Sequence, residues 1–158
     1  MTKRALVAFH TKSGASETYA SAIAGTLAAQ GIQADLVNLR DRTPEVSGYD
    51  AVIVGTGVRI SFVYGRWKKI LKQKELKSKK LFMFLSSGTA IEKPDEAANK
   101  YLSPIIAKYG LKPLLLGSFP GFIPAKMAET EAQKNSVKPE MAREWANEIA
   151  AKLKEAEG

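Results

Sequence analysis

Ala5-Leu-Val-Ala-Phe-His-Thr-Lys-Ser-Gly-Ala-Ser-Glu17 is the stretch that decides the fold of this chain. Its first half is short and apolar, which is typical of a buried β-strand. Its second half places the hydroxyls of Thr11, Ser13 and Ser16 around Gly14, directly before a segment with helical periodicity. Glycine lets the backbone approach a ligand, and a helix start adds unpaired N–H groups and a positive dipole end. This order predicts a cradle for a phosphate monoester.

The same hydroxyls have a simpler explanation. Ser13 or Ser16 would serve as the N-cap of the following helix, a position that serine favours. Hydroxyl-rich turns between strands and helices are common. The stretch alone therefore leaves both interpretations open.

Composition narrows the class of protein. The 158 residues suit one domain, residues 1–158, that is large enough to bury a core. The chain has no cysteine and one histidine, which excludes disulfides and Fe–S ligation and argues against a histidine-based metal site or triad. We therefore expect no metal. The apolar run at residues 5–9 is too short for a signal sequence or a membrane span, so we expect a cytoplasmic protein.

The net charge of +8 is the second unusual feature. Basic charge attracts nucleic acid, an anionic membrane surface or an acidic partner. No nucleic-acid motif and no ladder of aromatic residues accompanies the basic residues, so nucleic acid is not expected. The densest cluster falls on an expected short helix and the loop after it, where a solvated helix face is the simpler explanation. Its members are Lys68, Lys69, Lys72, Lys74, Lys77, Lys79 and Lys80.

Hydrophobic patterning predicts alternating strands and helices along the whole chain. The segment Leu81–Leu85 is apolar at every position, which is typical of the middle of a parallel sheet. Pro104 is expected to kink or split its helix. Strands are expected at 4–9, 33–39, 51–54, 81–85 and 114–116, and helices at about 15–30, near 67–71, near 97–109 and from 139. The pattern predicts an α/β protein with an open five-stranded parallel sheet covered on both faces.

Ligands of such sheets bind outside the carboxyl ends of the strands, which here lead into turns at 10–16, 55–66 and 86–94. A Walker-type loop is excluded because its Gly-Lys-Ser/Thr run is missing. A dinucleotide fingerprint is excluded because Gly14 is the only glycine in the first turn. A phospho-receiver domain needs acidic residues after the first and third strands, and this chain has none there. The turns instead suit a flat ligand with a phosphate tail.

Three segments together resemble the flavin-binding loops of the flavodoxin family, in the same order along the chain. They are Thr11-Lys-Ser-Gly-Ala-Ser16, Tyr49-Asp-Ala-Val-Ile-Val-Gly-Thr-Gly57 and Leu85-Ser-Ser-Gly-Thr89. The resemblance covers the whole chain. It implies a three-layer, doubly wound flavodoxin-like fold with strand order 2-1-3-4-5, and FMN as a non-covalently bound cofactor.

A finer resemblance concerns Val58-Arg-Ile60 and Gly65-Arg-Trp67. These pieces are similar to the branch of the family that includes menaquinone-dependent protoporphyrinogen dehydrogenase. The chain departs from that branch by a longer stretch, Ile60–Tyr64, between the two pieces. We expect this longer stretch to change the shape of the flavin's outer face and hence the choice of substrate.

The resemblance also implies which residues bind the cofactor. Hydroxyl and backbone groups of the first loop would hold the phosphate, Gly57 would face N5 of the flavin, and Arg59 would lie against the ring or near N1. The third loop would bind the pyrimidine edge. The full expected set is Thr11, Lys12, Ser13, Gly14, Ala15, Ser16, Thr56, Gly57, Val58, Arg59, Ser87, Gly88 and Thr89.

Two classes of function fit these expectations. One is an electron carrier that exchanges electrons with redox proteins, and the other is a flavoenzyme that acts on a small molecule such as a porphyrinogen or a quinone. A flavin-free scaffold is a weaker third. Carriers of the family are usually acidic, whereas this chain is basic, so an acidic or anionic partner is expected. FMN-dependent electron transfer holds under both leading alternatives.

Overall fold

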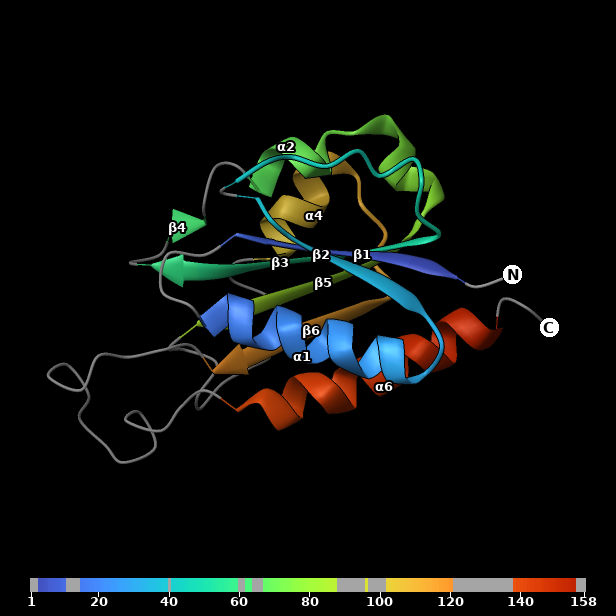
Figure 1. Ribbon diagram of the computed structural model, residues 1–158. Coiled ribbons are helices and arrows are strands. Elements are labelled where there is room, and N and C mark those ends of the chain that lie inside the picture. Colours follow the sequence, from blue (N-terminus) through green and yellow to red (C-terminus); the bar gives the residue numbers. More distant parts are fainter. Residues whose placement is uncertain are drawn as a thin grey trace, which may run out of the picture.

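The computed structural model describes residues 3–10, 15–39, 41–59, 62–63, 67–87, 96, 102–120 and 138–155. Their centre is a parallel sheet in the order β2-β1-β3-β5-β6 (Figure 1). Its strands are β1 (Arg4–His10), β2 (Gln33–Asn38), β3 (Ala51–Arg59), β5 (Lys80–Ser87) and β6 (Leu115–Pro120). The expected order 2-1-3-4-5 of five parallel strands is confirmed.

A short strand, β4 (Phe62–Val63), was not expected from the sequence. It pairs antiparallel with the end of β3, where Val58 faces Val63 and Arg59 faces Phe62. β3 runs five residues beyond the apolar segment that predicted it. Gly55, Thr56 and Gly57 interrupt the hydrophobic pattern there, so patterning alone ended the strand too early.

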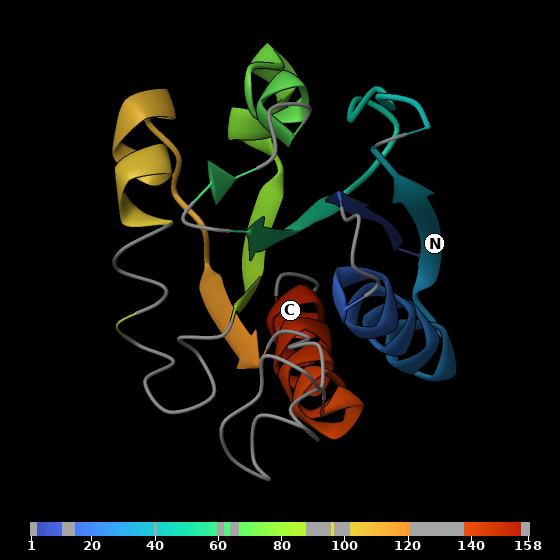
Figure 2. The same ribbon diagram turned by 90° about the vertical axis from the view of Figure 1, so that its left-hand side faces the viewer.

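Helices cover both faces of the sheet (Figure 2). On one face lie α1 (Ala15–Ala29) and α6 (Pro139–Glu155). On the other lie α2 (Trp67–Leu71), the 3-10 helix η1 (Lys74–Ser78) and α4 (Ser103–Tyr109). The three-layer arrangement is therefore confirmed.

The ends of the helices follow local chemistry. Gly31 has a φ of 82° and donates its N–H to the carbonyl of Ala28 at 3.1 Å, which ends α1 as its glycine predicts. Pro104 lies in the first turn of α4, where a missing N–H is tolerated. Residues 97–101, which precede it in the expected helix, lie outside the described residues, so the expected kink or split stays a prediction. β6 starts one residue later than expected and continues to Pro120, because Gly117 and Ser118 hide its pattern.

The core has two parts, one on each face of the sheet. The part under α1 and α6 is aromatic, with Phe84 and Phe119 from the sheet, Tyr19 from α1 and Trp145 from α6. The part under α2, η1 and α4 is aliphatic: Leu6, Val37, Leu39, Val46, Val52, Val54, Ile70, Leu76, Leu81, Met83, Leu85 and Leu102 are among its buried members.

Candidate functional site

The carboxyl ends of four strands meet at one edge of the sheet. His10 of β1 pairs with Thr56 of β3, and Gly57 pairs with Ser86 of β5. Ser87, the last residue of β5, pairs with the last residue of β6. α1 starts at this same edge and runs back along the sheet, so its N–H groups and positive dipole end lie here (Figure 1). The register therefore makes this edge the place where a ligand would meet several loops.

The expected site residues fall into two groups. Ala15 and Ser16 are the first two residues of α1, Thr56, Gly57, Val58 and Arg59 are the last four of β3, and Ser87 ends β5. The fold thus brings the backbones of three separate segments to one edge. Thr11, Lys12, Ser13, Gly14, Gly88 and Thr89 lie outside the described residues.

Gly55 is a residue of this edge that sequence reasoning did not single out. A Cβ at this position would overlap the ring of Phe84, the next strand's aromatic residue in the same register. Position 55 therefore requires glycine, because any larger residue would overlap the ring of Phe84 in the aromatic core. A glycine inside an apolar strand is the signal of such a close approach.

Ser86 is a second residue of this edge that is not in the expected binding set, although it belongs to the third loop. It is buried, 3% exposed, and stands beside Gly57 in the register of β3 and β5. Apart from the aromatic residues Tyr19 and Trp145, it is the one polar side chain among the buried residues that the structure describes. Its hydroxyl places a hydrogen-bonding group among apolar side chains at the edge where a ligand would bind.

Tyr19 fixes the start of α1. Its hydroxyl accepts the backbone N–H of Lys138 at 3.1 Å, and its ring lies 5.0 Å from that of Phe119. Burial raises the pKa of this phenol above its ordinary value, with a smaller contribution from the charge of Glu140. One side chain thus joins the beginnings of α1 and α6 to the end of β6, which holds the helix end where a phosphate would bind.

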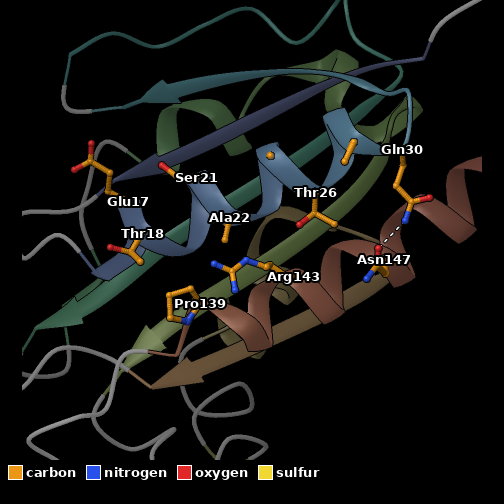
Figure 3. Close-up of a pocket in the computed structure, with 11 residues that line it drawn as sticks. Glu17, Thr18, Ser21, Ala22, Thr26, Gln30, Pro139, Arg143 and Asn147 are labelled. Carbon is orange, nitrogen blue, oxygen red and sulfur yellow. Dashed lines mark hydrogen bonds between the residues drawn. The ribbon is translucent and has the colours of Figure 1, made fainter.

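A groove of about 1020 Å³ lies elsewhere, between α1 and α6 (Figure 3). Small side chains such as Ser21, Ala22 and Gly25 leave this space open, and Arg143 extends into it from α6. The amide of Gln30 closes one end through a 2.6 Å hydrogen bond to Asn147. The described residues that line this groove all come from α1, from Gln30 directly after it, and from α6.

The described residues set two limits on the chemistry and location of the site. They contain no group of three or more His, Cys, Asp or Glu side chains placed to hold a metal ion. They also contain no helix that is both long and apolar enough to cross a membrane.

Comparison with known proteins decides the family. The sequence model of the flavodoxin domain matches residues 6–138. The chain belongs to the flavodoxin domain family. It binds FMN, as this family does, and the fold, family and cofactor expected from the three loops are confirmed. A phosphate suits the donors of this edge, which offers helix N–H groups and no carboxylate among residues 11–16.

Solved flavodoxins have the same fold. Oxidised flavodoxin 2 from Bacillus cereus is 21% identical, with a TM-score of 0.65 over 96% of this chain and 99% of that one. A flavodoxin from Streptococcus pneumonia TIGR4 is 18% identical, with a TM-score of 0.64 over 94% of this chain and 99% of that one.

A curated relative is similar over a shorter stretch. Protoporphyrinogen IX dehydrogenase [quinone] from Escherichia coli (strain K12) is 31% identical over 71 residues. The match covers 44% of this chain and 39% of the relative, so the aligned part is well under half of that protein.

Proposed function

We propose that this flavodoxin domain carries electrons between redox partners through FMN bound at the carboxyl edge of the sheet, with residues 1–158 acting as one domain. The observation that carries the proposal is the meeting of the α1 start, the end of β3 and the end of β5 at one edge. FMN supplies the electron chemistry when bound, and the chain orients it and limits the access of water. The partner and the expected cytoplasmic location stay predictions.

The phosphate of the cofactor is assigned to the start of α1. Thr11, Ser13 and Ser16 would donate hydroxyls, and Lys12, Gly14 and Ala15 would donate backbone N–H groups. The positive dipole end of a 15-residue helix adds to these donors. Tyr19 supports this assignment because it anchors the first turn of α1 to Lys138.

The ring of the cofactor is assigned to the two neighbouring strand ends. The last residues of β3, Thr56 to Arg59, would lie along the ring, with Gly57 opposite N5. Ser87, Gly88 and Thr89 would hydrogen-bond the pyrimidine edge. The pairing of Gly57 with Ser86 supports the assignment, because it sets these two loops side by side. No catalytic residue is assigned, since the protein needs no acid–base step of its own.

A flavoenzyme acting on a porphyrinogen or a quinone is the second candidate. The likeness to protoporphyrinogen IX dehydrogenase supports it, but that likeness spans 39% of the enzyme. Electron transfer through FMN is common to both candidates. Stopped-flow oxidation of the reduced protein separates them: a carrier reacts fastest with a redox protein, and an enzyme of this type reacts fastest with a quinone or a porphyrinogen.

The phosphate assignment has a direct test in the double variant Ser13→Ala with Ser16→Ala. Each charge-assisted hydrogen bond is worth roughly 1.5–3 kcal/mol. We expect FMN affinity to fall by about tenfold or more, while riboflavin, which has no phosphate, binds the variant and the wild type equally. Calorimetric titration with both flavins measures this.

A matched control is Ser21→Ala with Ser47→Ala, which removes two exposed hydroxyls of the described chain away from the strand ends. We expect it to bind FMN as the wild type does, with circular dichroism reporting an intact fold in both variants. If the wild type bound riboflavin as tightly as FMN, the phosphate cradle would be wrong. If the wild type folded but bound neither flavin, the proposed function itself would be contradicted.

A further inference from the structure

The positive charge of this protein comes from two segments. Residues 67–80 and 102–114 hold nine lysines and a single carboxylate, Glu75, a net charge of +8. The whole chain also has a net charge of +8. The rest of the chain is therefore electrically balanced, and the excess is a property of these segments alone.

The fold places both segments in the same layer, over the aliphatic face of the sheet (Figure 2). The Nζ of Lys77 in η1 lies 3.8 Å from the position of a Cβ on Gly110, which caps the end of α4. Two segments separated by 21 residues of sequence thus form one surface, the basic face. Its exposed lysines are Lys69, Lys72, Lys74, Lys77, Lys108 and Lys112.

These lysines are not neutralised by neighbours that the structure describes. Among the described residues, none of the six has a carboxylate oxygen within 4.0 Å; the ion pair found there joins Arg4 on β1 to Asp35 on β2, toward the opposite outer strand of the sheet from β6. Six ammonium groups on one face, none in an ion pair with a described residue, repel each other and attract an anionic surface.

An apolar spot adjoins the basic face. Leu114 and Leu116 are 48% and 41% exposed, and Leu114 follows Lys112 by two residues. Leu116 pairs with Met83 on β5, whose side chain belongs to the aliphatic core, so Leu116 points to the same side of the sheet. Protein–protein interfaces combine an apolar patch with polar surroundings, and an apolar spot next to exposed lysines fits that arrangement.

We propose that the basic face docks an acidic protein whose contact surface has an apolar centre. Lysine without arginine fits diffuse attraction to carboxylates, because bidentate phosphate binding is the property of arginine. The leucines are half covered on a sheet strand, which suits contact with another protein and gives too little projection to enter a lipid bilayer. Base stacking on nucleic acid would need several aromatic residues, and these two segments contain only Trp67 and Tyr109.

The part of the docking surface formed by η1 and Lys112 lies away from the carboxyl edge where FMN is proposed to bind, so the proposal does not depend on the flavin. η1 and Lys112 precede the amino ends of β5 and β6, whereas the proposed FMN site lies at their carboxyl ends. β5 has eight residues, which corresponds to roughly 23 Å between its ends. A partner held at the η1 end leaves the carboxyl edge open.

The charge test uses the full chain and a synthetic peptide with glutamates on both sides of a Leu-Leu pair. We expect the triple variant Lys74→Glu, Lys77→Glu and Lys112→Glu to bind this peptide at least tenfold more weakly than the wild type. The control Arg42→Glu, Lys138→Glu and Arg143→Glu has the same net charge, and we expect it to retain most of the affinity. Equal losses in both would show a net-charge effect and overturn the assignment to this face.

If circular dichroism shows that the triple glutamate variant does not fold, a variant with glutamine at the same three positions is used in its place. We expect this variant to bind the peptide about threefold more weakly than the wild type. Peptide-induced NMR shifts of the wild type are expected at residues 69–80 and 105–116. Shifts confined to other residues would contradict the proposal whatever the variants do.

The apolar centre has its own matched pair. Leu114→Ser with Leu116→Ser is expected to weaken peptide binding several-fold, whereas Leu36→Ser changes a leucine of similar exposure, 43%, on the opposite outer strand and leaves binding unchanged. Phosphatidylglycerol vesicles and duplex DNA complete the test. Tighter binding to either than to the peptide, at equal concentration of negative charge, would overturn the choice of an acidic protein.

Discussion

The two faces of the sheet are built by different means. On the α1 and α6 face, four aromatic rings contact one another: the centroids of Phe84 and Phe119 are 5.9 Å apart, and those of Phe119 and Trp145 are 5.7 Å apart at 77°. On the α2 and α4 face, aliphatic side chains fill the core under short helices. The aromatic face positions the start of α1 at the carboxyl edge, where we propose that FMN binds, while the aliphatic face carries the lysines of the basic face.

This difference indicates which face of the sheet tolerates amino-acid substitutions better. Rigid rings that meet edge to face have few alternative packings, and glycines must make room for them. A Cβ on Gly117 would lie 2.8 Å from the ring of Phe119 and 3.0 Å from that of Trp145. Aliphatic chains adjust more easily, so we expect substitutions of equal size to cost more on the aromatic face.

Gly55→Ala is expected to have the largest effect, because the new methyl group would overlap the ring of Phe84. Overpacking of this kind costs about 3 kcal/mol or more. Urea unfolding with FMN in fixed excess measures it. Gly25→Ala is the control: nothing lies within 4 Å of its added Cβ in α1, so stability should rise by roughly 0.5–1 kcal/mol.

The overlap itself can be tested by adding Phe84→Leu to Gly55→Ala. The smaller side chain should recover part of the lost stability, so that the two changes are not additive. Additive losses would show that Gly55 is needed for its backbone and not for the space that the ring occupies.

Phe84→Leu and Met83→Leu compare the two faces directly, because these neighbours on β5 are both fully buried and point to opposite sides. Phe84 loses two ring contacts, with Phe119 and Trp145, so we expect a cost of about 2 kcal/mol. Met83→Leu conserves volume and should cost under about 1 kcal/mol. Equal costs would remove the distinction between the faces.

Tyr19→Phe is expected to have a smaller effect, about 1 kcal/mol at neutral pH, from loss of the hydrogen bond to Lys138. The pKa of Tyr19 is raised by burial, so the unfolded chain releases this proton first. The stability that the neutral phenol provides is present below pH ~10 and falls as the pH rises toward the folded pKa.

The variant should therefore lose less stability between pH 9 and pH 11 than the wild type does. Tyr49 has a pKa that is raised by burial and by its hydrogen bond to Asp35, so the free energy of unfolding still depends on pH in both proteins. Urea midpoints across this range give the comparison. Parallel pH curves for the two proteins would mean that Tyr19 ionises as easily in the folded state as in the unfolded chain.

Local sequence predicted much of the fold for identifiable reasons. The apolar run in β5 marked a central strand, Gly31 marked the end of α1, and three hydroxyl- and glycine-rich loops marked the family. Each of these signals lies within a few neighbouring residues. The limits of β3 and β6 were predicted less well, because Gly55, Gly57 and Gly117 interrupt the pattern that defines a strand.

The sequence by itself determined the alternation of strands and helices, the parallel sheet and the flavin-binding family, because these depend on periodicity and on short motifs. Tertiary structure alone decided that Gly55 must leave room for Phe84, that Tyr19 meets Lys138, and that Lys77 adjoins Gly110. These pairs are far apart in the chain. Only the packing of whole elements brings them within contact, so no local pattern could contain them.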